Sequence, residues 1–261
     1  MEPTAMDGLK KSTKNFLRKP ANKLKKFQPK TKEELQELVD DIFNVNLGDI
    51  DTSLITDMSY LFSNINPRIK LLSRTDFSGI ENWDVSNVTN MNDMFYGATN
   101  FNQPLNSWDV SNVRNMSGMF AGAEKFNQPL DNWDVSSVTN MSGMFKYAES
   151  FNRLLERLDV SSVTNMSDMF YGTKKFNQPL DNWDVSSVND MREMFAGAES
   201  FNQPLDNWDV SSVYDISRMF WGATNFNQPL DNWDVSSVTD MSRMFKNSAQ
   251  DPLPKWYRQA I

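Results

Sequence analysis

A unit of 25 residues recurs along most of this chain, and one copy includes the segment FNQPLDNWDVSSVTNMSGMF from Phe126 to Phe145. Tryptophan returns at this interval at positions 83, 108, 133, 183, 208 and 233, and Leu158 takes the one remaining place. A unit this short cannot bury an apolar face by itself, so consecutive units must stack against one another. The chain is therefore predicted to form one continuous repeat structure.

The apolar pattern inside each unit suggests how it folds. Val113, Met116, Met119, Phe120 and Ala123 follow one another at intervals of three and four residues, which is typical of one face of a helix. The Phe-Asn-Gln-Pro-Leu segment is typical of a short extended element, and stacked copies would form a parallel ladder. We therefore predict an α/β repeat solenoid that is leucine-rich-repeat-like, with a short parallel strand and a helical segment in each coil.

The two ends of the chain differ from the repeats. Thr31 and Glu34 form a capping-box signature before a helical pattern, which predicts a helical N-terminal cap. Trp256 and Tyr257 follow two prolines that stop the repeat, and they are expected to lie over the last coil. The predicted regions are a basic, disordered extension (1–30), the cap helix with a degenerate first repeat (31–76), a seven-repeat solenoid (77–251) and a C-terminal cap (252–261).

Two polar residues recur in nearly every unit. Asparagine is found at positions 102, 127, 152, 177, 202 and 227, and aspartate at positions 84, 109, 134, 159, 184, 209 and 234. The asparagines are predicted to form a buried ladder that bonds backbone groups between coils. Each aspartate is predicted to accept backbone N–H groups in a local turn. A calcium ladder is the alternative, but no metal site is predicted.

Composition narrows the classes of function. The chain has no cysteine and no histidine, which rules out disulfides, a Ser-His-Asp triad and the usual histidine-ligated zinc sites. The formal net charge of −8 disfavours nucleic acid binding by the repeats. A carboxylate-based glycosidase is a remote alternative, because equivalent carboxylates in every coil supply no acid and base of unequal pKa. We expect no enzyme activity, no catalytic residues and no cofactor.

Segments such as DNWDVSSVTNMSGMF and LITDMSYLF also carry a resemblance. Over about residues 30 to 256 the chain resembles the bacterial surface protein repeat family, the BspA-like, leucine-rich-repeat-related proteins with mycoplasma-type surface repeats. This resemblance implies a leucine-rich-repeat-like solenoid at the cell surface or outside the cell, with a role in adhesion. No apolar stretch is long enough for a membrane span, and no signal peptide is recognisable, which leaves a cytoplasmic location open.

Binding residues are expected where otherwise identical units differ. Two variable positions lie outside the apolar pattern, and exposed tyrosine and tryptophan are frequent anchors of interfaces. The predicted partner-binding residues are Tyr96, Tyr171, Tyr214 and Trp221. The predicted function is that of a non-enzymatic scaffold that binds a protein or glycan partner, as an adhesion-type surface protein. The alternative is an intracellular interaction scaffold or effector-like binder, and the sequence predicts no oligomeric state.

Overall fold

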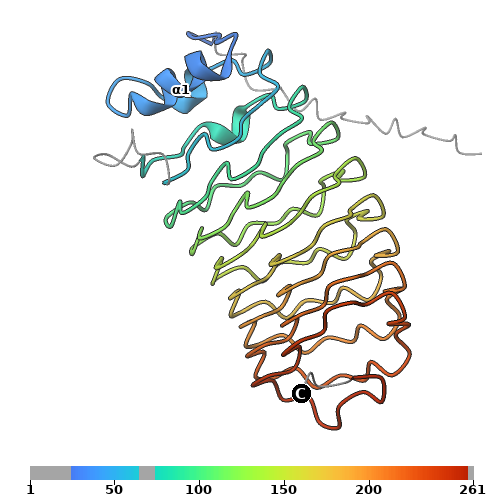
Figure 1. Ribbon diagram of the computed structural model, residues 1–261. Coiled ribbons are helices and arrows are strands. Elements are labelled where there is room, and N and C mark those ends of the chain that lie inside the picture. Colours follow the sequence, from blue (N-terminus) through green and yellow to red (C-terminus); the bar gives the residue numbers. More distant parts are fainter. Residues whose placement is uncertain (1–24, 65–73, 258–261) are drawn as a thin grey trace, which may run out of the picture.

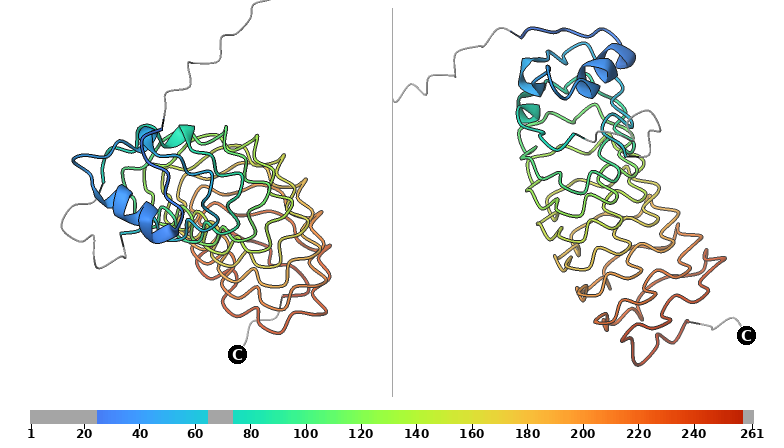
Figure 2. Two further views of the ribbon diagram at one scale, coloured as in Figure 1. Left: turned by 90° about the horizontal axis from the view of Figure 1, so that it is seen from above. Right: turned by 90° about the vertical axis from the view of Figure 1, so that its left-hand side faces the viewer.

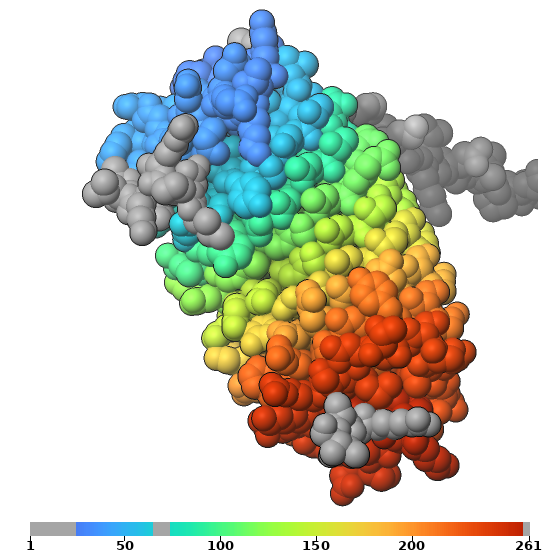
Figure 3. Space-filling model, viewed as in Figure 1, coloured from blue at the N-terminus to red at the C-terminus, as the bar shows by residue number. Residues whose placement is uncertain are grey.

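The computed structural model of this protein describes residues 25–64 and 74–257, which wind into a stack of coils (Figure 1). Each coil takes up one 25-residue unit, and successive coils follow the chain from the N-terminal end of the stack to the C-terminal end. The views in Figure 2 show the same progression from two further directions. The side chains of neighbouring coils close into a continuous surface (Figure 3). The predicted extension at residues 1–30 lies mostly outside the described residues.

Helix α1, Lys32–Asp40, covers the N-terminal end of the stack (Figure 1). Thr31 is its N-cap, and its hydroxyl accepts a hydrogen bond from the Glu34 backbone N–H at 3.2 Å. The Glu34 carboxylate accepts from the N–H of Lys30, the residue before the N-cap, so the predicted helix start is confirmed although the second bond of the capping box is displaced by one residue. The buried Leu35 and Val39 face the first coil. Two 3₁₀ turns, η1 (Leu47–Asp49) and η2 (Ile80–Asn82), are the other helical elements of the described residues.

The prediction of an α/β solenoid with a strand and a helical segment in each coil is wrong. The described repeats contain neither an α-helix nor an extended strand, and neighbouring coils meet at isolated parallel bridges such as Asn90 to Asn115. The segment expected to be helical is a series of tight turns. Met94 N–H donates to the Met91 carbonyl at 3.2 Å, and the next turns repeat this three-residue spacing. Such turns place apolar residues on one side much as a helix does, which explains the misleading pattern.

Backbone conformation shows why these turns cannot continue as a helix. Asp93 and Gly97 have φ angles of 51° and 67°, in the left-handed region that the third residue of a type II turn requires. Equivalent residues of the other coils repeat these values, for example Asp168 at 58° and Gly172 at 64°. Because a right-handed helix needs negative φ throughout, each left-handed residue ends any helical path.

Between coils, the turns are joined by a regular set of backbone hydrogen bonds. Four alternate N–H groups of one coil donate to four carbonyls of the following coil at 2.7 to 2.9 Å: Met91 to Asn115, Asp93 to Ser117, Phe95 to Met119 and Gly97 to Ala121. The same four bonds recur with small changes down the stack. These bonds hold the register at 25 residues, because each bond joins the same two positions of neighbouring units.

The core is built from columns of equivalent side chains. Phe120 stacks on Phe126 within its coil, with ring centroids 4.0 Å apart, and on Phe145 of the next coil at 5.8 Å. Burying each such ring stabilises the fold by about 1.5–3 kcal/mol. The tryptophans add a polar bond, since Trp133 Nε1 donates to the Leu105 carbonyl of the preceding coil at 2.9 Å. Aromatic burial and backbone satisfaction therefore act together at every coil boundary.

The two polar columns differ in how well they were predicted. Asp134 Oδ1 accepts from Ser136 N–H at 3.1 Å and from its hydroxyl at 2.6 Å, and the other aspartates of this column accept the same Ser N–H bond. The predicted local turn is confirmed, and these bonds lower the pKa of Asp134. The asparagine ladder also forms, with Asn202 N–H donating to Asn177 Oδ1 at 3.0 Å. The prediction that it is buried is wrong, because its members are exposed or only half-buried.

At the C-terminal end, Trp256 continues the tryptophan column although it lies outside the 25-residue interval. Its ring stacks on Trp233 with centroids 6.1 Å apart, and its Nε1 donates to the Leu230 carbonyl at 2.7 Å. Tyr257 packs edge-on against Phe245 at 5.0 Å. Both residues therefore lie over the last coil, as the sequence predicted.

Candidate functional site

One side of the stack carries most of the variation between coils. We call it the turn face, and define it by the side chains at positions 92, 93 and 96 and those at 25-residue intervals from them. The third of these positions holds Tyr96, Ala121, Lys146, Tyr171, Ala196, Trp221 and Lys246. The turn face combines the exposed ring of Trp221 with the small, buried Ala121 and Ala196, so its surface is uneven.

An open groove of about 430 Å³ runs along the turn face across several coils. Gly118, Ala121 and Gly143 line its middle, where the missing side chains leave room. Tyr96 and Asp93 line one end, and Lys146, Asp168 and Arg192 line the other. The groove therefore presents an aromatic ring and charges of both signs around a middle of glycine, alanine and serine.

A cluster of polar and aromatic groups forms one end of the groove. Lys146 Nζ lies 2.8 Å from Asp168 Oδ1 and 4.6 Å from the centroid of the Tyr171 ring. Tyr147 packs edge-on against Tyr171, with centroids 5.1 Å apart. The hydrogen bond with Tyr147 and the burial of its hydroxyl raise the pKa of Tyr171 to about 12. Tyr171 is therefore a neutral phenol across the physiological range.

Asp93 forms the opposite end of the groove. Asn92 Nδ2 donates to Asp93 Oδ2 at 3.0 Å and to Ser117 Oγ at 2.8 Å, so the side chains of two coils are joined. Burial raises the pKa of Asp93, although hydrogen bonds from Tyr60 and Asn92 oppose that effect. This carboxylate is consequently held in place but poorly solvated.

The four predicted site residues do not form one cluster. Tyr96, 37% exposed, lines the groove, and Tyr171 lies half-buried beside its far end. Trp221, 36% exposed, occupies the same position two coils further on. Tyr214, 47% exposed, belongs to a different position of the coil, next to the bridge residue Asp215, and is not on the turn face.

Sequence reasoning missed the charged residues of the groove. Asp93, Asp168 and Arg192 occupy positions where other coils have glycine or serine. That contrast was visible in the sequence, because the position of Asp93 holds a charged residue in five coils and glycine in two within an otherwise strict repeat. The prediction of a helix obscured the importance of these charged residues, because a helix would not place them beside Tyr96 and Lys146.

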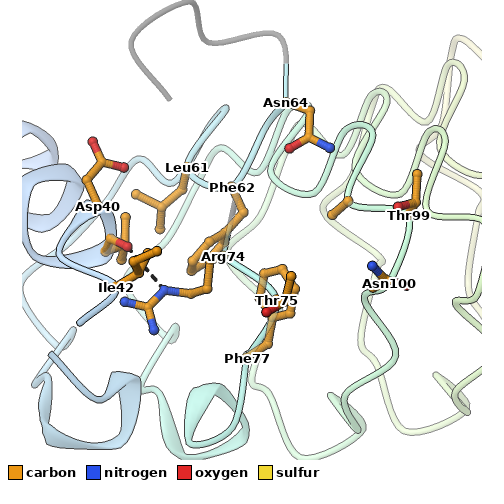
Figure 4. Close-up of a pocket in the computed structure, with 12 residues that line it drawn as sticks. Asp40, Ile42, Leu61, Phe62, Asn64, Arg74, Thr75, Phe77, Thr99 and Asn100 are labelled. Atoms are coloured by element: carbon orange, nitrogen blue, oxygen red, sulfur yellow. Dashed lines mark hydrogen bonds between the residues drawn. The ribbon is translucent and has the colours of Figure 1, made fainter. Parts of the chain in front are cut away.

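A second, smaller cavity of about 60 Å³ lies between α1 and the first coils (Figure 4). Arg74 projects beside it and donates from Nε to the Val39 carbonyl at 3.1 Å and from Nη2 to the Val45 carbonyl at 3.2 Å. These acceptors belong to the last turn of α1 and the loop after it, where a cation is favourable. Arg74 therefore holds the cap on the stack, which is a structural role.

Within residues 25–64 and 74–257, no three acidic side chains gather closely enough to hold a metal ion. Across the same ranges, no helix has the length and apolar character needed to cross a lipid bilayer.

Comparison with known families matches the chain along nearly all of its length. The model of a family described as Mycoplasma protein of unknown function, DUF285, matches residues 5–67, 69–161 and 153–256. The comparison does not confirm the resemblance to BspA-like proteins. No curated protein and no solved structure matches the chain. On these three consecutive matches, the chain belongs to the DUF285 family of repeat proteins.

Proposed function

We propose that this protein is a non-enzymatic repeat scaffold that binds a protein or glycan partner through the turn face. The observation that carries the proposal is the groove of about 430 Å³ between Tyr96 and Lys146. Its volume falls in the range of ligand sites, and small side chains leave room between a few fixed polar groups. Aromatic and cationic side chains around such a groove are suited to either an extended peptide or a sugar ring.

Backbone strain supports the same face. Glu193, Arg218 and Arg243 have φ angles of 56°, 53° and 58° at the position where Gly118 and Gly143 adopt φ of 60° without a side-chain penalty. A left-handed conformation costs a residue with a side chain roughly 1–2 kcal/mol. Retaining charged side chains at strained positions is understandable if those side chains contact a partner.

We further propose that the protein acts at the cell surface in adhesion, as the resemblance of its repeats implies. An intracellular interaction scaffold is the alternative. Fractionating cells of the source organism and probing with an antibody to the chain distinguishes these proposals. A pool accessible to protease added outside intact cells supports the surface role, and a wholly protected cytosolic pool contradicts it.

The binding proposal is tested by filling the groove. The chain is screened on a glycan array and against a displayed peptide library, and each hit is remeasured with the variants Ser142→Trp and Ser162→Trp. Ser142 lines the groove, whereas Ser162 is exposed elsewhere on the stack. We expect the indole at 142 to weaken binding at least tenfold and the indole at 162 to leave it unchanged. Equal affinity of both variants for every hit would contradict the assignment of the groove.

A further inference from the structure

On the turn face, the four backbone hydrogen bonds that join each coil to the next all run in one direction, which makes the two ends of this face chemically different. Bonds elsewhere in the coil run the other way, such as the one from Arg114 N–H to the Thr89 carbonyl at 2.9 Å. In each coil the N–H groups of four alternate residues point toward the following coil, and the carbonyls that they meet point back. The bond from Arg218 N–H to the Ser242 carbonyl, at 2.9 Å, is one of the last of these. On the turn face, the final coil therefore ends in four N–H donors, and the first coil ends in carbonyl acceptors.

The donors of the final coil form a row without acceptors. In the preceding coil, Ile216, Arg218, Phe220 and Gly222 donate to the final coil at 2.9 to 3.0 Å. Their equivalents one coil later are Met241, Arg243, Phe245 and Asn247, and no residue of the described ranges accepts a hydrogen bond from these four N–H groups. We call this row the open edge. A row of unpaired backbone donors is a template for pairing with another chain.

A groove of about 470 Å³ lies beside the open edge. Arg243 and Lys246 line it on the side of the last coil, and Leu253 and Tyr257 line it on the side of the C-terminal segment. Asp251 is the acidic residue of this lining. The Gln250 side chain also lines the groove, and its Oε1 is buried without a hydrogen-bond donor. The groove thus offers donors, two cations and one unsatisfied acceptor beside apolar walls.

We propose that the open edge binds an acidic segment of another protein, and that this segment adopts tight turns like those of a further coil. The backbone carbonyls of that segment accept hydrogen bonds from the four N–H groups, in the register that a further coil would adopt. Its carboxylates lie against Arg243 and Lys246, which outnumber Asp251 in the groove. Asp240, the nearest other acid on this coil, already accepts from Ser242 N–H at 2.8 Å.

A second copy of this chain does not fit the open edge. Head-to-tail stacking would need the carbonyl row of the first coil, but α1 covers it, with Gln36 Nε2 donating to the Leu61 carbonyl at 3.1 Å. Lys32 Nζ also contacts Asp57 of that coil, at 3.5 Å. Tail-to-tail contact would set one row of N–H donors against another, which forms no hydrogen bonds. An acidic segment of a different protein meets neither obstacle.

Residue-resolved hydrogen exchange on the full chain tests the proposal. The probe is a blocked octapeptide that alternates valine and glutamate, at millimolar concentration, and its control alternates valine and lysine. Without peptide, we expect the amides of Met241, Arg243, Phe245 and Asn247 to exchange far faster than those of Ile216, Arg218, Phe220 and Gly222. The glutamate peptide should slow the four edge amides at least tenfold, and the lysine peptide should not.

Two charge-reversed proteins complete the test. The double variant Arg243→Glu and Lys246→Glu should lose the protection by the glutamate peptide. The double variant Arg114→Glu and Lys175→Glu should keep it, because both residues are exposed away from the open edge. The proposal is overturned if the glutamate peptide protects none of the four amides, or if both peptides protect them equally. Slow exchange of these amides without peptide would also overturn it, because the edge would then be covered already.

Discussion

The residues that form the parallel bridges between coils show how a single side chain can lower the stability of the fold. The bridge residue is asparagine at positions 90, 115, 140 and 165, but aspartate at 190, 215 and 240. Asp190 is buried, and that burial raises its pKa, although its Oδ1 accepts from Arg192 N–H at 3.0 Å. Asparagine keeps the same acceptor without burying a charge.

We predict that Asp190→Asn raises the free energy of unfolding at pH 7 by about 1 kcal/mol, the size of a typical single substitution. Because the folded-state pKa is raised, the gain should be present above that pKa and disappear as the pH falls toward the unfolded value of about 3.9. Urea unfolding between pH 4 and 8 measures this. A gain that does not depend on pH would contradict the explanation.

Asp240→Asn is the matched control for that prediction. Asp240 is exposed, and hydrogen bonds from Ser242 N–H and its hydroxyl lower the pKa of the carboxyl. A lowered folded-state pKa contributes stability above the unfolded pKa that is lost as the pH falls. The Asp240 variant should therefore not be stabilised at pH 7, in contrast to the Asp190 variant.

The asparagine ladder is expected to contribute to stability through its individual hydrogen bonds. Asn177→Ala removes the acceptor of Asn202 N–H, at 3.0 Å, and of Gln203 Nε2, at 3.0 Å. We expect a loss of about 1 kcal/mol in the free energy of unfolding, because a half-buried backbone donor is left without its partner. Asn207→Ala, at an exposed position, is the control. Equal urea midpoints for the two variants would show that the ladder is dispensable.

At the scale of elements, the cap could be predicted and the coil could not. Thr31 and Glu34 predicted α1 because capping depends on a few neighbouring residues. The turns of each coil depend instead on bonds to the next coil, such as Phe95 N–H to the Met119 carbonyl at 2.9 Å. Intervals of three and four residues are common to helices and to successive tight turns, so Met116 and Met119 could not distinguish them.

The same limit applies to the candidate site. The sequence predicted that the variable residues Tyr96 and Trp221 are exposed, and both side chains are exposed in the structure. The groove depends on the small residues between charged ones, and only the fold shows that Gly118 and Gly143 lie between Asp93 and Asp168. Sequence variation located the side of the unit that carries the groove, but the space of the groove is formed by neighbouring coils together.

Arg74 allows the attachment of α1 to be tested. Arg74→Met removes the bonds to the Val39 and Val45 carbonyls while it keeps much of the side-chain volume. We expect the cap to be destabilised by about 2 kcal/mol, since bonds from a charged donor are lost. Hydrogen exchange in α1 should then accelerate by at least tenfold, whereas Arg157→Met, at an exposed arginine of the repeats, should not change it. Unchanged exchange in α1 would contradict the role of Arg74.

At the scale of the whole molecule, both proposed surfaces depend on the stacking of one coil per 25 residues. The turn face exists only if equivalent positions align, and the open edge exists only if the four hydrogen bonds of the turn face run the same way at each coil. Every unit from Asn90 to Asp240 contributes a bridge to this alignment. A change in register at any coil would therefore interrupt both the turn face and the row of hydrogen bonds between coils.

Distances between spin labels test the stacking most directly. Because the chain has no cysteine, single cysteines can be introduced in pairs at the equivalent positions 87, 112, 137 and 237 without competing sites. Coils about 4.8 Å apart predict label separations of roughly 19, 24 and 29 Å from position 237 to positions 137, 112 and 87. Double electron–electron resonance should give these rising distances with narrow distributions. Distances that do not rise with the number of intervening coils would contradict the stack.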